Sequence, residues 1–141
     1  MNIYFACSIT GGREFEAVYQ VITKVLTEDN HRVPTAHLAE SSVMAKEAII
    51  DPFEVYTRDV MWIRESDALI AEVSVPSHGV GYEIGFALGL EKPVLALYQQ
   101  GRKVSKMISG NPDSNLYVMA YESPDHASTL FREFLSKTLY S

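Results

Sequence analysis

Short apolar runs alternate with amphipathic stretches along almost the whole chain, and this alternation predicts the order of strands and helices. Apolar runs bounded by small or polar residues indicate strands, whereas apolar residues spaced three and four apart indicate helices. The predicted strands span residues 2–7, 31–35, 67–73, 93–98 and 116–121. The predicted helices are one with Phe15, Val18, Tyr19, Ile22, Val25 and Leu26 on its apolar face, and others over 51–66, about 80–91, about 102–109 and from Ser123-Pro124 onward. The weak pattern of residues 36–50 predicts only a short helix or a mobile flap.

Strands that alternate with helices predict an α/β fold with a parallel sheet covered by helices on both faces. Five predicted strands favour the flavodoxin-like (Rossmann-like) order 2-1-3-4-5, in one domain over residues 1–141. In that order the crevice lies at the carboxyl ends of strands one and three. The loops that leave these two strands, residues 8–12 and 74–81, are both rich in glycine and serine. We therefore expect a small-molecule site where the two loops meet.

Composition and charge narrow the class of partner. The net charge of -6 and the pI near 5.1 argue against a nucleic-acid polymer, although a single phosphate needs only a few local donors. Cys7 is the only cysteine, so an internal disulfide is not expected, and the four histidines show no metal-ligand spacing. Met1 leads directly into the first strand, and no apolar run reaches the length of a membrane span. These features predict a cytoplasmic protein without a zinc site.

Glu83 is the leading candidate for catalysis. It lies in the segment 74–89, where an apolar strand leads through a glycine-rich loop into an apolar helix. Glycines let a ligand approach the backbone closely. A carboxylate at the opening of a helix faces the positive end of the helix dipole, so we expect Glu83 to stay ionised. An ionised carboxylate beside such a cradle suits attack on the sugar of a nucleotide.

Asp59 is the second acidic candidate. On its predicted helix it shares an apolar stripe with Trp62 and Ile63. An acid in such a place is costly unless it has a partner or a chemical task. One interpretation is a helix-edge acid paired with Arg58 or Arg64. The other is a general acid or base that contacts the leaving nucleobase.

The remaining candidates are single residues near the expected cleft. Tyr4 lies in the first strand, where its hydroxyl either hydrogen-bonds Glu83 or belongs to a core aromatic with its tip at the surface. His37 follows the second predicted strand and is either a base contact or a solvated loop histidine. Possible phosphate donors are Ser8, Ser77, Ser105 and the backbone N–H of Gly79.

Six pieces of the chain, taken in order, carry a resemblance to a known family. They are Ile3-Tyr-Phe, Ser8-Ile-x-Gly-Gly-Arg13, Asp59-x-x-Trp62, Ala71-Glu-Val73, Pro76-Ser-x-Gly-Val-Gly-Tyr-Glu-Ile-Gly85 and Ser105-x-Met-Ile108. In order and spacing the chain resembles the nucleoside 2-deoxyribosyltransferase superfamily over nearly its whole length. The resemblance implies a flavodoxin-like homodimer that acts on a small nucleotide without a cofactor.

The resemblance also implies roles for individual residues. Glu83 is implied to be the nucleophile, Tyr4 its orienting partner and Asp59 the residue that serves the leaving base. The residues implied to bind the 5'-phosphate are Ser8, Ile9, Gly11, Ser77 and Gly79, with Ser105 contributed by the neighbouring subunit. Mammalian members have an arginine where this chain has Thr10. Residues that could supply the missing charge are Arg13, Arg102 and Lys103.

The activity that these residues favour is hydrolysis of the N-glycosidic bond of (2'-deoxy)nucleoside 5'-monophosphates through a covalent sugar–Glu83 intermediate. The serine-rich cradle favours a nucleotide hydrolase over a transferase that moves deoxyribose between free bases. A ribonucleotide glycosidase that acts on CMP-like substrates is a further alternative. From a different class, a non-catalytic nucleotide sensor also fits the fold, but two acids in the cleft give no advantage to a protein that only binds an anion.

Overall fold

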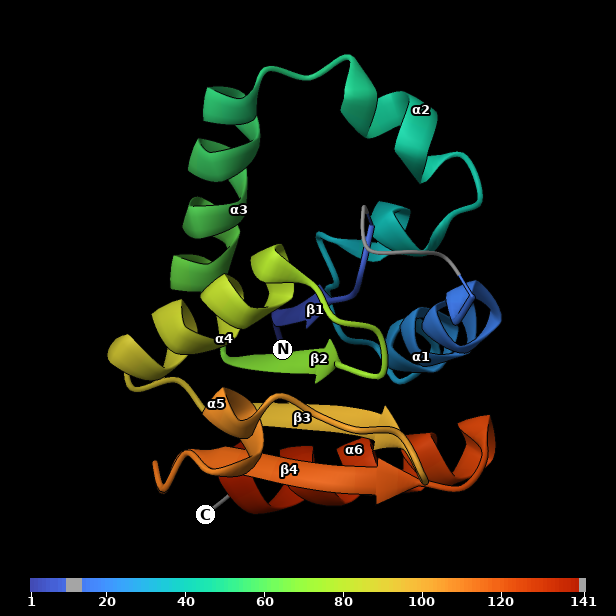
Figure 1. Cartoon of the computed structure of the whole chain (residues 1–141), viewed down its shortest axis with the longest axis vertical. Coiled ribbons are helices and arrows are strands. Elements are labelled where there is room, and N and C mark those ends of the chain that lie inside the picture. The colour runs from blue at the N-terminus through green and yellow to red at the C-terminus, as the bar shows by residue number, and fades with distance from the viewer. Residues whose placement is uncertain (10–13, 140–141) are drawn as a thin grey trace.

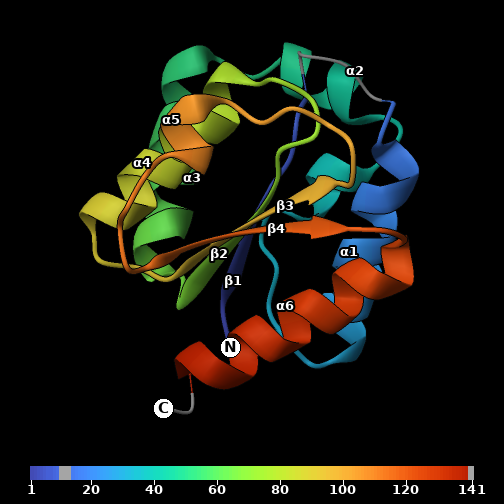
Figure 2. The same cartoon turned by 60° about the horizontal axis from the view of Figure 1, so that its bottom comes forward.

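The computed structural model describes residues 1–9 and 14–139 and shows a parallel sheet with helices on both faces (Figures 1 and 2). Within the described residues the sheet has four strands in the order β1-β2-β3-β4. The strands are β1 (Ile3–Ala6), β2 (Ala68–Glu72), β3 (Val94–Gln99) and β4 (Leu116–Tyr121). The helices are α1 (Glu16–Glu28), η1 (Ala36–Ala39), α2 (Val43–Ala48), α3 (Pro52–Glu65), α4 (His78–Gly89), α5 (Lys106–Ser109) and α6 (Pro124–Leu139). No helix in this part of the chain combines the length and apolar character needed to cross a membrane.

The predicted second strand is reduced to a single bridge, so the expectation of five strands was wrong. Arg32 pairs with Asn2 in an isolated parallel bridge on the outer side of β1, the side that the order 2-1-3-4-5 assigns to this segment. Pro34 follows closely and has no backbone N–H with which to extend the ladder. The N–H of Phe5 instead donates to the hydroxyl of Thr35 over 3.0 Å. A side chain thus replaces the strand partner, and the chain turns away into η1.

Each face of the sheet has its own apolar core. The core on the α1 and α6 face includes Ile3 and Phe5 of β1, whereas the core on the α4 face includes Tyr4 and Ala6. This division follows from the alternation of side chains along a strand. Figure 2 shows α1 and α6 on one side of the sheet and α3 and α4 on the other. The strand geometry therefore directs Tyr4 toward α4.

The helices that flank the later site begin at or near the expected positions, α3 at Pro52 and α4 at His78, two residues before the expected start near residue 80. Asp51 caps α3, and its carboxylate accepts the N–H of Phe53 over 2.8 Å, with Pro52 in the first helical position. Ser77 caps α4, and its hydroxyl accepts the N–H of Val80 over 3.3 Å. The weakly patterned segment 36–50 forms η1 and α2 rather than an open loop.

A buried polar network fixes the carboxyl ends of three strands. The carboxylate of Glu72, at the end of β2, accepts the N–H and the hydroxyl of Ser74 over 2.7 and 2.8 Å, and also the hydroxyl of Tyr121. The hydroxyl of Ser74 accepts the N–H of Gln99 over 2.8 Å. Burial raises the pKa of Glu72 above its ordinary value, and these hydrogen bonds oppose the rise. The network anchors the start of the loop that carries Ser77.

Candidate active site

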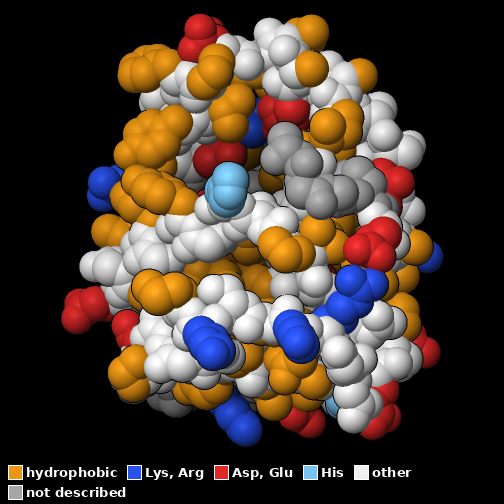
Figure 3. Space-filling model, viewed as in Figure 1, with side chains coloured by type: hydrophobic (Ala, Val, Ile, Leu, Met, Phe, Trp, Pro, Cys, Tyr) orange, Lys and Arg blue, Asp and Glu red, His pale blue; other side chains and the backbone are white. Residues whose placement is uncertain are grey.

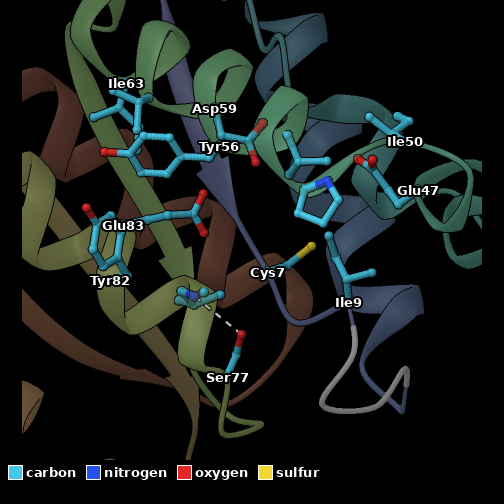
Figure 4. A pocket seen from close by; sticks show the side chains of 15 residues that line it. Cys7, Ile9, Glu47, Ile50, Tyr56, Asp59, Ile63, Ser77, Tyr82 and Glu83 are labelled. Carbon is cyan, nitrogen blue, oxygen red and sulfur yellow. Dashed lines mark hydrogen bonds between the residues drawn. The ribbon is translucent and has the colours of Figure 1, made fainter.

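A cleft of about 460 Å³ opens beyond the carboxyl ends of β1 and β2, between α3 and the first turns of α4 (Figure 4). Figure 3 shows acidic side chains inside a hollow whose rim is largely hydrophobic. The described residues that line the cleft are Cys7, Ile9, Glu47, Ile50, Pro52, Val55, Tyr56, Asp59, Val60, Ile63, Ser77, Gly79, Val80, Tyr82 and Glu83. The crevice that the predicted strand order assigns to these two loops is therefore present in the structure.

Glu83 and Tyr4 meet in this cleft. The Glu83 carboxylate points into the cavity (Figure 4), and its Oε2 accepts a hydrogen bond from the hydroxyl of Tyr4. Tyr4 is fully buried in β1, and its side chain extends from the sheet to Glu83 on α4. The hydrogen bond expected from the sequence is thus confirmed, and it fixes one carboxylate oxygen while Oε1 lies toward Gly79.

The expectation that the helix dipole keeps Glu83 ionised was wrong for the ligand-free protein. Glu83 is the sixth residue of α4, which begins at His78, and the influence of the dipole is confined to the first turn. Burial instead raises the pKa of Glu83 to about 8, because an ionised carboxylate is poorly solvated there. At neutral pH most molecules of the ligand-free protein therefore carry a protonated Glu83.

Asp59 lines the same cleft from α3, so the structure brings the two acidic candidates together. Its Oδ1 accepts a hydrogen bond from Nε of Arg58 over 2.9 Å. Burial raises the pKa of Asp59, and the hydrogen bond and charge of Arg58 act against the rise. The pairing with Arg58 confirms the first interpretation of Asp59, and its place in the lining is compatible with the second, whose contact to a leaving base stays a prediction.

The candidate phosphate cradle is only partly within the cleft. The cleft is lined by Ser77, Gly79 and Ile9, whereas Ser8 is fully buried and does not line it. A Cβ atom on Gly79 would lie 3.9 Å from Oγ of Ser77 and 4.0 Å from Oε1 of Glu83. The bare glycine backbone therefore leaves open the space between the candidate anion donor and the candidate nucleophile.

The other candidate phosphate residues lie elsewhere. Thr10, Gly11 and Arg13 fall in the segment 10–13, which is outside the described residues. Arg102 pairs with Glu14, Nη2 to Oε2 over 2.9 Å, at the surface. Lys103 and Ser105 line a neighbouring hollow of about 520 Å³, which is also bordered by Ser77. Within one chain, Ser105 is therefore on the other side of the Ser77 loop from Glu83.

His37 contacts the cleft through a residue that sequence reasoning missed. Its Nε2 lies 3.1 Å from Oε1 of Glu47, and its ring meets that of Trp62 at 5.9 Å between centroids. Glu47 lines the cleft from α2. The sequence does not predict that Glu47 lies near Asp59, because the weak pattern of residues 36–50 does not show which side of α2 faces the cleft.

Two aromatic side chains at the cleft were also missed. Tyr56 of α3 and Tyr82 of α4 meet edge to face at 6.3 Å between ring centroids (Figure 4). Both are about half exposed, at 52% and 56%. Their signal in the sequence is closeness to an expected catalytic acid: Tyr56 is three residues, or about one helical turn, before Asp59, and Tyr82 directly precedes Glu83.

Comparison with known proteins shows the family to which the chain belongs. A family model described as nucleoside 2-deoxyribosyltransferase matches residues 3–129. The chain belongs to this family of proteins. The 5-hydroxymethyl-dUMP N-hydrolase of Mus musculus is 39% identical over 138 residues, covering 94% of this chain and 79% of the relative.

A further relative agrees in length, and a solved structure agrees in fold. The 5-hydroxymethyl-dUMP N-hydrolase of Danio rerio is 36% identical over 137 residues, covering 95% of each chain. Among solved structures, the CMP N-glycosidase of Clostridium botulinum superposes with a TM-score of 0.71 at 21% identity, over 94% of this chain and 99% of that one. That structure shares the α/β fold of the present chain.

Proposed function

We propose that this protein hydrolyses the N-glycosidic bond of 2'-deoxynucleoside 5'-monophosphates and releases the free base and 2-deoxyribose 5-phosphate. The observation that carries the proposal is one cleft in which Glu83, held by Tyr4, and Asp59 occupy facing walls near the Ser77 loop. Two carboxyl groups that flank a scissile bond are what retaining glycosidic hydrolysis requires. The relatives named as N-hydrolases support the same reaction.

In the first half-reaction, the ionised Glu83 attacks C1' of the sugar from the face opposite the base. A C1'–oxygen bond forms to Glu83 while the C1'–nitrogen bond breaks, and its electron pair leaves with the base. Asp59 protonates the departing base. Tyr4 holds one oxygen of Glu83 so that the other faces C1'. The transition state resembles an oxocarbenium ion, whose positive charge favours the ionised form of Glu83.

In the second half-reaction, water attacks C1' and releases Glu83 as a carboxylate. Asp59, which has lost its proton to the base, accepts a proton from the water as the new C1'–oxygen bond forms. The hydroxyl group of water becomes the anomeric hydroxyl of 2-deoxyribose 5-phosphate. Both acids thereby return to their starting protonation, and the cycle needs no cofactor.

The 5'-phosphate is assigned to Ser77 and the backbone at Gly79, with Ser8, Ile9 and Gly11 from the first loop, and a second subunit is proposed to complete the site with Ser105. The hollow that holds Ser105 shares Ser77 with the catalytic cleft. Large apolar side chains that border this hollow are exposed, with Met107 at 84% and Tyr82 at 56%. A homodimer that covers this surface would bring the partner's hydroxyl toward the phosphate. The cytoplasmic location expected from the sequence stays a prediction.

The homodimer is tested by complementation between two inactive parents. Glu83→Ala and Ser105→Ala proteins are mixed, unfolded together and refolded, which allows hybrid dimers to form. If Ser105 acts across the interface, a hybrid has one site with both residues intact, and activity on nucleotide at low concentration returns. Activity that stays at the average of the two parents would mean that Ser105 serves its own chain or neither site. Sedimentation analysis of the parent protein checks the dimer directly.

The function is tested by product analysis with dGMP, GMP, deoxyguanosine and 5-hydroxymethyl-dUMP, each with and without free adenine. Free base and 2-deoxyribose 5-phosphate from a deoxynucleotide, unaffected by adenine, are the expected result. Deoxyadenosine formed from deoxyguanosine would instead identify a transferase. Base release from GMP alone would identify a ribonucleotide glycosidase, and no product from any substrate would favour the sensor.

The assignment of the nucleophile has its own test. Glu83→Ala should lose several decades of kcat, because a nucleophile and its partners act as a unit. Retention of more than about a tenth of the activity would contradict the assignment. Ser77→Ala is the matched control: it should raise KM for nucleotides and leave KM for nucleosides nearly unchanged, since only nucleotides carry the phosphate.

A further inference from the structure

Arg58 lies at the centre of a set of contacts that joins α2 to α3. Its Nε donates to Oδ1 of Asp59 over 2.9 Å. Its two terminal nitrogens face the carboxylate of Glu47, Nη2 to Oε1 over 2.8 Å and Nη1 to Oε2 over 3.4 Å. The guanidinium plane also lies over the ring of Trp62, at 4.8 Å from the ring centroid. One rigid group therefore contacts two acids of the cleft and one aromatic ring simultaneously.

These contacts are largely shielded from solvent. The side chains of Arg58, Glu47 and Asp59 are 23%, 12% and 19% exposed. Ion pairs in such surroundings are screened much less than pairs on the open surface. A planar guanidinium with fixed donors matches a carboxylate through two parallel hydrogen bonds, which an ammonium group cannot reproduce.

We propose that Arg58 is a positioning residue that acts through Asp59 and Glu47. Its positive charge offsets the negative charge of the two carboxylates, and its contacts hold helix α2 against α3 at the wall of the cleft. The part that concerns catalysis rests on the proposed function. The contacts to Glu47 make the segment 36–50 part of the active-site wall. The contact to Asp59 keeps that carboxyl group able to give a proton in one half-reaction and take one in the other.

The charges around Asp59 explain why a cation is needed there. Arg58 faces it from its own helix, Glu47 from α2 and His37 from η1, while Glu83 lines the cleft from α4. Burial and the charge of Glu47 raise the pKa of Asp59, whereas Arg58 and His37 act in the other direction. Without Arg58, the higher pKa would make Asp59 a weaker acid toward the departing base in the first half-reaction.

The test is the pKa of Asp59, measured by carbon-13 NMR of its carboxyl group in protein that carries Glu83→Gln to remove the neighbouring titration. Arg58→Gln should raise the pKa of Asp59, and Glu47→Gln should lower it. Arg58→Lys, which keeps the charge, should give a value between those of the parent and Arg58→Gln. Arg64→Gln is the matched control, since Arg64 lies on the same helix over Phe86 and should leave Asp59 unchanged.

The direction of the change separates this role from a structural one. If Arg58 served only to hold the fold, Arg58→Gln would admit water and relieve the burial of Asp59, so the pKa of Asp59 would fall. A fall, or equal shifts in Arg58→Gln and Arg64→Gln, would overturn the proposal. Because this measurement uses no substrate, it decides the proposal even if no nucleotide is hydrolysed.

Kinetics test the second part of the proposal. Arg58→Lys should raise KM about tenfold with kcat within about twofold, because the charge remains but the two-point contact to Glu47 is lost. Arg58→Gln should also slow the first half-reaction, in which Asp59 protonates the base, and this would appear as slower release of free base in a single turnover. Unchanged KM in Arg58→Lys, or an unchanged single-turnover rate of base release in Arg58→Gln, would refute the proposed action on the reaction.

Discussion

Glu83 should lower the stability of the fold at neutral and alkaline pH, and Glu83→Gln should relieve that cost. The pKa of Glu83 rises from 4.5 to about 8 on folding, because burial disfavours the ionised carboxylate. Between these two values the folded protein binds more protons than the unfolded chain. The free energy of unfolding therefore falls as pH rises from about 4.5 to 8, and this group changes it no further above pH 8.

The magnitude follows from the same two values. At about 1.36 kcal/mol per pKa unit, a rise from 4.5 to about 8 corresponds to about 5 kcal/mol. This is a large share of the roughly 5–15 kcal/mol that stabilises a typical domain. Glutamine has nearly the same shape and carries no charge, and it can still accept the hydroxyl of Tyr4. Glu83→Gln should therefore match the parent near pH 4 and exceed its stability by several kcal/mol at pH 9.

Urea unfolding of both proteins across this pH range measures the difference. The matched control is Glu133→Gln, which replaces an exposed acid on α6 and should change the free energy of unfolding by only a few tenths of a kcal/mol. The reasoning is refuted if the gain in Glu83→Gln does not depend on pH, or if the variant is the less stable protein at pH 9.

Three further substitutions have defined outcomes. Tyr4→Phe removes the hydrogen bond to the Glu83 carboxylate and should lower kcat about ten- to hundredfold with little change in KM; a loss below threefold would argue against the orienting role. Asp51→Ala removes the cap of α3 and should lower the free energy of unfolding by about 1 kcal/mol in urea, whereas an unchanged midpoint would mean that the cap is dispensable. Gly101→Ala places a side chain at φ 93° and should cost about 1 kcal/mol, measured in the same way; equal stability would show that the turn readjusts.

The sequence predicts most of the framework because its signals are local. The cap at Asp51 and the apolar run of β2 depend on neighbouring residues, and both elements form where expected. The meeting of Tyr4 with Glu83 could also be anticipated, because parallel order places β1 beside the strand that leads into α4. The absence of a strand at residues 31–35 has a local cause too, because Pro34 has no backbone N–H to donate to the ladder.

The electrostatics of the site could not be predicted in the same way. The pKa of Glu83 depends on which side chains exclude water from it, and those side chains come from several elements. The contact between Arg58 and Glu47 joins residues eleven positions apart across a turn between two helices. Neither the pKa of Glu83 nor the contact between Arg58 and Glu47 has a pattern of its own in the sequence, because both depend on how separate elements pack together.

The proposed reaction sets a requirement on the protonation of both Glu83 and Asp59, and this makes the pH profile of kcat/KM informative. The productive form has Glu83 ionised and one proton on Asp59. Burial without a neighbouring cation raises the pKa of Glu83 to about 8, whereas Arg58 opposes the rise at Asp59, so in the ligand-free protein the proton lies mainly on Glu83. The last proton of the two acids is therefore lost near pH 8, when Glu83 ionises.

It follows that kcat/KM of the parent should fall about tenfold per pH unit above about 8. In Asp59→Asn the only requirement left is an ionised Glu83, so its much lower kcat/KM should instead rise with pH and level off above about 8. Steady-state rates between pH 5 and 10 on one deoxynucleotide would record both profiles. Two profiles that rise together would show that Asp59 accepts a hydrogen bond from the leaving base as a carboxylate and never protonates it. Opposite profiles would show that Asp59 donates the proton. The fall of kcat/KM at alkaline pH disappears only when the residue that donates the proton is replaced.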